Sequence, residues 1–274
     1  MNPQEQLAWE ARFAKPAAVS AFLAAALIVA GTVVRQVVAL SDRPDDEREF
    51  LLAIDDKSGA FIASAFIQSL SFIFLAVVLF YLYSATKARK PEFPVIAVVI
   101  AVLGPLLLAV AGPLSDLSRL DIADEFLSSG PQTNKRAEDL LEDRSVSAAA
   151  VGSAGTLALA IALVLININA MRVGLLSRFM GIIGAIIGGL YVLPILSGPL
   201  IVQLFWLVAI GPLFLGHWPG GRGPAWSKVE AVPWPTGAEL RAKAAETVDP
   251  PDASDAEPAD EAAAPRKRKR KKRR

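Results

Sequence analysis

The sequence lacks cysteine and has a single histidine, His217, among its 274 residues. Disulfide bonds, thiolate ligands and cysteine nucleophiles are therefore excluded, and there is no histidine pair to hold haem or a metal ion. The chain also lacks an HExxH motif, a phosphate-binding glycine loop and a carboxylate pair inside any apolar segment. We therefore expect a protein that is not an enzyme and that has no cofactor and no metal site.

Charged residues are scarce, at 20% of the chain, whereas apolar residues make up 53% and lie in uninterrupted blocks. A block of about 18 or more such residues is typical of a transmembrane helix, because a helix rises about 1.5 Å per residue across a hydrocarbon core of about 30 Å. The last two apolar segments are separated by Ser197-Gly198-Pro199. In a five-span alternative, which stays open, these two segments merge into one span or form a re-entrant hairpin. We expect an all-α bundle of six spans, at residues 17–40, 60–83, 94–114, 146–170, 179–196 and 199–217.

The distribution of basic residues indicates the orientation of the spans. The short connections 84–93 and 171–178 are dense in lysine and arginine. In contrast, 41–58 has three basic and seven acidic residues, and 116–144 has four and eight. Because short basic loops stay on the cytoplasmic side, we expect both termini to lie inside, in the cytoplasmic membrane of a bacterium.

The two acidic connections contain helical patterns of their own. Apolar residues recur at helical spacing in 45–56, 116–127 and 134–144, and Thr133 or Asn134 can cap the last of these helices. We expect the three helices to form a solvated cap on the bundle. A site for a cation or a basic partner is the alternative.

The segments before the first span and after the last span have the composition of segments that lie at a membrane interface. Residues 1–16 predict an interfacial helix with Trp9 and Phe13 on one face, ended by Pro16. After the last span, residues 218–245 predict an interfacial ribbon, with a proline-rich docking peptide as the alternative. This ribbon carries a tryptophan at every eighth position, namely Trp218, Trp226 and Trp234.

The chain ends in an acidic and then basic segment, 246–274, that is too poor in apolar residues to fold, so we expect it to be disordered. Near a membrane, the closest polyanion is the anionic lipid headgroup layer, which attracts each basic residue by about 1 kcal/mol. Nucleic acid is not the expected partner, because the run has no residues that stack on or read bases. The basic residues are Arg266, Lys267, Arg268, Lys269, Arg270, Lys271, Lys272, Arg273 and Arg274.

Arg35 is the one charged residue inside a predicted span. It lies about 18 residues into its helix, or roughly 27 Å along the axis, which is close to the outer surface. We expect its side chain to snorkel to that surface, with pairing to an outer-loop carboxylate as the alternative.

The third and sixth spans have glycine-proline pairs at matching places in two inverted halves of three spans each. Such breaks form the substrate sites of many secondary transporters, although glycine and proline are also common in transmembrane helices. A small-solute transporter with a site between these two spans is therefore an alternative function. Its candidate residues are Gly104, Pro105, Gly211, Pro212, Arg35 and Asn167.

Small residues in the fifth span indicate close helix packing. Gly184 and Gly188 form a GxxxG pair, and Gly181 begins a second small-residue row. This face packs either within the bundle or across a homodimer.

Six spans, with Ser153 near glycines on the fourth and His217 on the sixth, resemble the rhomboid proteases. The predicted topology argues against this chemistry. It places Ser153 about 10 Å below the outer surface and His217 at the inner surface, over about 15 Å away, whereas a Ser–His dyad lies within hydrogen-bond distance.

Two stretches resemble a group of uncharacterised bacterial multi-pass membrane proteins that end in similar basic tails. These are the run RVGLLSRFMGIIG from Arg172 and the segment GHWPGGRGPAW followed by PWP. The resemblance implies a membrane location and no particular activity. We therefore expect a non-enzymatic membrane component that acts through contacts with lipids or a membrane partner.

Overall fold

The computed structural model describes residues 2–41, 44–144, 146–193, 200–218 and 222–235, together with residues 238, 239 and 241. The chain divides into two units, Met1–Trp234 and Pro235–Arg274. The predicted disordered tail, including the basic residues 266–274, lies outside the described residues. The apolar helices all belong to the first unit.

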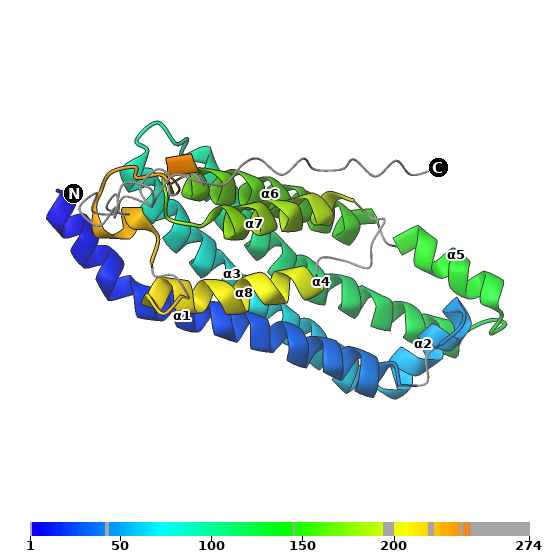
Figure 1. Cartoon of the computed structure of the whole chain (residues 1–274). Helices are drawn as coiled ribbons and strands as arrows, with labels where there is room; N and C mark the ends of the chain where they lie inside the picture. Colours follow the sequence, from blue (N-terminus) through cyan, green and yellow to red (C-terminus); the bar gives the residue numbers. More distant parts are fainter. Residues whose placement is uncertain are drawn as a thin grey trace, which may run out of the picture. The chain divides into compact units, whose positions relative to one another are not determined.

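The described residues form helices and no strand, which confirms the all-α prediction (Figure 1). A π-helical turn, Val34–Ala39, extends the first helix, and a 3₁₀ turn, Pro224–Ser227, follows the last one. The α-helices are α1 (Pro3–Val33), α2 (Glu47–Asp56), α3 (Ser58–Arg89), α4 (Ile96–Ser128), α5 (Asn134–Arg144), α6 (Val146–Arg172), α7 (Arg178–Val192) and α8 (Leu200–Leu215).

Four stretches of helix in the described part of the chain are long and apolar enough to cross a membrane. They are Pro3–Ala39, Ser58–Arg89, Ile96–Ser128 and Ala149–Arg172. The apolar helices α7 and α8 are shorter, with 15 and 16 residues. Large apolar side chains such as Val110 and Ile201 are exposed on the outer surface of the bundle, as expected for contact with lipid. The chain is a multi-pass membrane protein.

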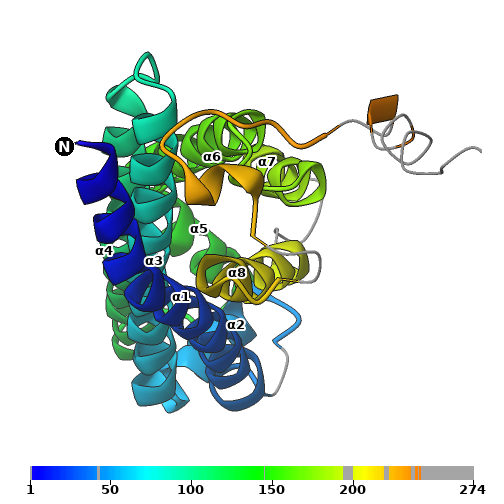
Figure 2. The ribbon, with the colours of Figure 1, turned by 60° about the vertical axis from the view of Figure 1, so that its left-hand side comes forward.

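The six apolar helices pack as a closed ring in the order α1, α3, α4, α6, α7, α8, with α8 returning to α1 (Figure 2). The helix α3 also contacts α6 across the ring. A row of alanines on α1, including Ala17, Ala21 and Ala24, is buried in the main core. A second, smaller core joins α2 and α5 to the ends of α3 and α4, around Phe61 and Phe126.

Two helices are longer than the sequence predicted. The helix α1 begins at a capping box between Asn2 and Glu5 and continues through Pro16, where a helix end was expected. The helix α4 continues through Pro113 and includes 116–127, which was expected to be a separate helix. A proline removes one hydrogen bond from a helix. Pro113 is nevertheless buried, and Ala14 and Ala17 on either side of Pro16 are buried too, so both prolines lie in packed stretches of helix.

Candidate functional site

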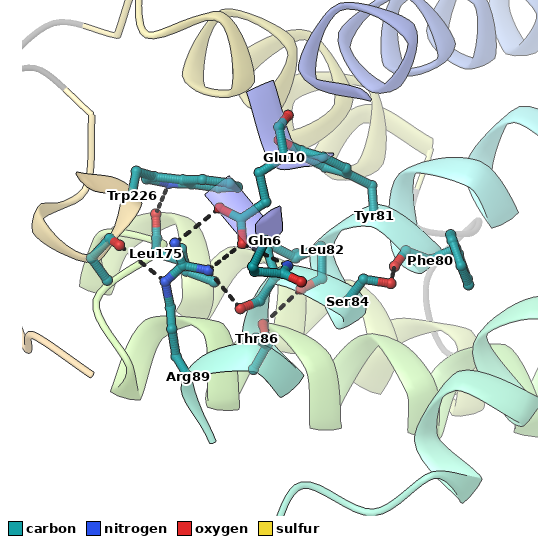
Figure 3. Close-up of polar contacts among 12 residues, drawn as sticks. Gln6, Glu10, Phe80, Tyr81, Leu82, Ser84, Thr86, Arg89, Leu175 and Trp226 are labelled. Carbon is teal, nitrogen blue, oxygen red and sulfur yellow. Dashed lines mark hydrogen bonds and ion pairs between the residues drawn. The ribbon is translucent and has the colours of Figure 1, made fainter. Parts of the chain in front are cut away.

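A buried ion pair joins the N-terminal part of α1 to the C-terminal end of α3 (Figure 3). Two nitrogens of the Arg89 guanidinium donate to the two carboxylate oxygens of Glu10, at 2.6 and 2.9 Å. The side chains are 0% and 2% exposed. Gln6 also donates to Glu10, and Arg89 donates to the carbonyl oxygens of Ala85 and Ala225. Such additional hydrogen bonds are what a buried pair needs to offset the loss of hydration.

The bond from Arg89 to Ala225 connects this pair to the C-terminal segment, where Trp226 is buried. The indole N–H of Trp226 donates to the carbonyl oxygen of Leu175 at 2.9 Å. Its ring stacks on Tyr81, at 5.9 Å between centroids, and the guanidinium of Arg222 lies 4.6 Å from its centroid. The expected interfacial ribbon is therefore corrected at this position, because Trp226 lies among protein side chains.

The backbone of the same segment lies against the turn between α6 and α7. Gly174 has a positive φ of 85°, and a Cβ there would overlap the carbonyl oxygen of Val232. Val232 donates to the carbonyl oxygen of Val173 at 3.0 Å, and Ala225 donates to that of Gly174 at 3.3 Å. The Arg172–Arg178 run and the tryptophan-proline segment, which the sequence presents as separate motifs, thus contact each other.

We call this the basic end of the bundle, because positive side chains gather there. Lys90 donates to Asn169 at 2.8 Å. The guanidinium groups of Arg89 and Arg222 lie 5.6 and 4.6 Å from the Trp226 ring centroid, in the stretch 222–235 that we call the docked segment. The complete set at the ends of α3, α6 and α7 is Lys87, Arg89, Lys90, Arg172 and Arg178.

We call the opposite end of the bundle the acidic end, because it carries α2 and α5, which are rich in aspartate and glutamate. At this end Arg35 pairs with Asp116. The two distances are 2.6 and 3.1 Å, and the Asp116 side chain is 4% exposed. Arg119 donates to the same carboxylate at 2.8 Å, and the Arg35 guanidinium also lies 4.5 Å from the Phe61 ring centroid. The alternative prediction for Arg35, pairing with a carboxylate, is confirmed, although this carboxylate belongs to α4 and not to a loop.

Two cavities adjoin this cluster. The first, of about 550 Å³, is bounded by the start of α2, Arg35 and the end of α4. The second, of about 610 Å³, lies between α3, α4, α6 and α7, and Tyr191 is among its lining residues. Ser115 and Arg119 line both cavities, so the two meet at one turn of α4.

The comparisons with known proteins identify a family. The model for a domain of unknown function, DUF4386, matches residues 18–218. The chain belongs to the DUF4386 family. No curated protein and no solved structure matches it significantly. The match covers the ring of six helices and ends before the segment that contains Trp226, so that docked segment lies beyond the DUF4386 match.

The structure places the two glycine-proline pairs of the DUF4386 region against different helices. A Cβ on Gly104 would lie 2.6 Å from the backbone nitrogen of Leu159 on α6. A Cβ on Gly211 would lie 2.7 Å from the ring of Phe22 on α1. Both glycines therefore allow close helix packing. A substrate site at these pairs, which are completed by Pro105 and Pro212, stays a prediction.

The glycine row of α7 lies against α6. Gly181 adjoins Met171, and a Cβ on Gly184 would overlap the side chain of Asn167. A Cβ on Gly188 would lie 2.6 Å from the carbonyl oxygen of Ala160. Asn167 is fully buried and its amide donates to Leu163, but its side-chain oxygen has no partner among the described residues.

Ser153 and His217 lie in different parts of the DUF4386 protein. Ser153 lines the second cavity, at the acidic end. His217 lies two residues after the end of α8, whose Phe214 packs edge-on against Trp226 at the basic end. In the described part of the chain, no three histidine, aspartate or glutamate side chains are grouped closely enough to hold a metal ion.

Proposed function

We propose that this protein is a non-enzymatic, six-span component of a bacterial cytoplasmic membrane, with both termini inside. In this proposal it acts through its C-terminal segment and basic tail, which contact anionic lipid headgroups and so bring a membrane partner to the basic end. The docked segment around Trp226 is the observation that carries the proposal. Its hydrogen bonds to Val173, Gly174 and Leu175 attach the chain to the bundle just before the tail begins.

The charge of the bundle supports this orientation. The basic end carries the short connections after α3 and α6, whose lysines and arginines favour the cytoplasmic side. The acidic end carries α2 and α5, with their excess of aspartate and glutamate. A tail that starts from the basic end would then lie beside anionic headgroups, where nine basic residues add up to a strong attraction.

The closed ring of six apolar helices supports a count of six spans. The helices α7 and α8 would be about 22 to 24 Å long, which is shorter than a typical hydrocarbon core. They nevertheless complete the ring between α6 and α1 and expose large apolar side chains such as Phe205 and Val208. A local thinning of the bilayer accommodates helices of this length at modest cost.

The test compares the lipids that co-purify, in mild detergent, with three proteins: the full chain, a chain that lacks 266–274, and a chain of full length with uncharged residues at 266–274. We expect anionic lipids to be enriched only with the full chain, and this enrichment to fall as salt is raised, because the attraction is screened. Identical lipids in all three samples would overturn the proposal and favour the small-solute transporter. Substitutions at Gly104 and Gly211 in reconstituted vesicles would then test that alternative.

A further inference from the structure

We propose that the two cavities at the acidic end together form a binding site for one phospholipid whose headgroup carries a phosphate and a primary ammonium, as in phosphatidylethanolamine. The acyl chain would lie in the second cavity and the headgroup in the first. This site is at the opposite end of the bundle from Trp226, and it stands whether or not the tail contacts lipid.

The cavities have the extent that such a ligand needs. Their lining residues on α4 run from Leu108 to Ile122, which corresponds to about 21 Å along the helix axis. Leu108 belongs to the apolar part of α4, whereas Asp116 and Arg119 begin its polar end. The second cavity thus lies at the level of acyl chains and the first at the level of headgroups.

The walls of the second cavity suit a hydrocarbon chain. Phe72, Leu108, Ala111, Leu157 and Val192 contribute apolar surface from four different helices. Gly112 and Gly152 leave space on the walls: a Cβ on Gly112 would have no neighbour within 4 Å, and one on Gly152 would have its nearest at 3.8 Å. An acyl chain in such a slot gains van der Waals contacts with apolar walls on several sides.

Arg119 is placed to bind the phosphate. It stands at the junction of the two cavities, its side chain is 40% exposed, and one of its nitrogens donates to Asp116. That carboxylate already accepts two hydrogen bonds from Arg35. Two guanidinium groups therefore share one carboxylate, which leaves positive charge and open N–H donors at the junction. A phosphate, which is the anionic group of a phospholipid, matches such a fork of donors.

The first cavity selects against a purely anionic headgroup. Asp45, Asp46 and Glu47 line its other side, and the carboxylates of Asp45 and Glu47 are exposed. These acids would repel a second negative charge but would attract an ammonium group. A primary ammonium can also donate hydrogen bonds to carboxylates, which a quaternary ammonium cannot. Cationic and anionic groups are thus arranged in the order of a zwitterionic headgroup.

The test uses the full chain, freed of lipid in detergent, and measures lipid binding by native mass spectrometry. Three lipids with identical acyl chains are offered in competition: phosphatidylethanolamine, phosphatidylcholine and phosphatidylglycerol. We expect phosphatidylethanolamine to occupy one site with an affinity about tenfold or more above the other two, because only its headgroup carries a positive charge that also donates hydrogen bonds to the carboxylates.

Three variants probe the three parts of the site. Gly112→Leu fills the second cavity and should abolish tight binding, whereas Gly189→Leu, at a glycine with equally open surroundings outside this site, should not. Arg119→Ala removes the phosphate partner and should weaken binding about tenfold; Asp116 keeps its pair with Arg35 in this variant. The double variant Asp45→Asn with Glu47→Gln should remove the preference over phosphatidylglycerol, and Asp55→Asn with Asp56→Asn, at the other end of α2, is its control.

The proposal would be overturned by equal binding of the three lipids. It would also be overturned if binding in Gly112→Leu were unchanged, because the lipids would then be held on the outer surface of the bundle. A thermal unfolding curve for each variant separates loss of the site from loss of the fold. A variant that unfolds early is replaced by its conservative partner, Gly112→Val or Arg119→Gln, and judged by the same lipid competition.

Discussion

Glu10 and Arg89 form a bidentate ion pair, at 2.6 and 2.9 Å, at the junction of α1, α3 and the C-terminal segment. The two residues are 79 positions apart in the sequence, and neither side chain is exposed by more than 2%. The carbonyl oxygen of Glu10 also accepts the hydroxyl of Tyr81 at 3.0 Å. The pair therefore fixes the start of the chain, the end of α3 and the segment before the tail at one point.

Breaking this pair should destabilise the protein strongly. In Arg89→Ala, Glu10 stays buried without its partner, so we expect the free energy of unfolding to fall by about 3 to 5 kcal/mol. The double variant Glu10→Leu with Arg89→Met should lose much less, because no charge remains buried. Unfolding in mixed detergent micelles measures both. A loss below about 1 kcal/mol in Arg89→Ala would mean that Glu10 is hydrated and that the two residues do not form a buried pair.

Trp226 should hold the C-terminal segment to the bundle. Without its ring, contacts to Tyr81, Phe214 and Arg222 are lost together with the hydrogen bond to Leu175. In Trp226→Ala we expect trypsin to cleave after Lys228 at least about tenfold faster, since large-to-small changes at buried aromatics cost about 3 to 5 kcal/mol.

The matched control is Trp226→Phe, which keeps an aromatic ring but has no N–H to donate to Leu175. Its cleavage rate should lie between those of the parent protein and Trp226→Ala. Equal cleavage rates in all three proteins would show that the segment is attached by its backbone alone, through Val173 and Gly174.

The positions of the apolar helices could be predicted from the sequence, because the length and hydrophobicity of a segment are local properties. The predicted span 146–170 corresponds to α6, and the predicted helix 134–144 matches α5 with its bounds. The bounds of α4 were harder to predict. The sequence predicted a separate helix at 116–127, because charged residues begin at Asp116. In the structure Asp116 accepts hydrogen bonds from both Arg35 and Arg119, and Arg35 is 81 positions away in the sequence.

The same reason explains why the basic-end site was missed. Glu10 and Trp226 are of residue types that are common at membrane interfaces. Their burial depends on Arg89, which is 79 positions from Glu10, and on Leu175, which is 51 positions from Trp226. Periodicity carries no information on such pairs. The sequence does contain one signal, which is a glycine in each of the two stretches, Gly174 and Gly223. In the structure, a Cβ on Gly174 would collide with Val232, and a Cβ on Gly223 would collide with the backbone of Gly174 and Leu175.

At the acidic end, Asp116 should matter more than Arg119. In Asp116→Ala both Arg35 and Arg119 lose their shared carboxylate, and we expect a loss of about 3 kcal/mol or more. In Arg119→Ala the pair with Arg35 stays, and an exposed pair contributes about 0 to 1 kcal/mol. Unfolding curves of the two variants, measured under identical conditions, give the comparison. Equal losses would contradict the view that the Arg35–Asp116 pair stabilises this end.

The contact between Gly184 and Asn167 should show compensation. In Gly184→Ala the new methyl group would overlap the Asn167 side chain, so we expect the free energy of unfolding to fall by about 1 to 3 kcal/mol. Adding Asn167→Ala should recover most of this loss, because it clears the space and removes a buried oxygen without a partner among the described residues. Gly189→Ala is the control: a Cβ there has no neighbour within 4 Å, so better helix propensity should make it neutral or slightly stabilising. If the Gly184→Ala protein were as stable as the Gly189→Ala control, the close contact between α6 and α7 would be contradicted. If Asn167→Ala did not restore stability to Gly184→Ala, the strain would lie at a residue other than Asn167.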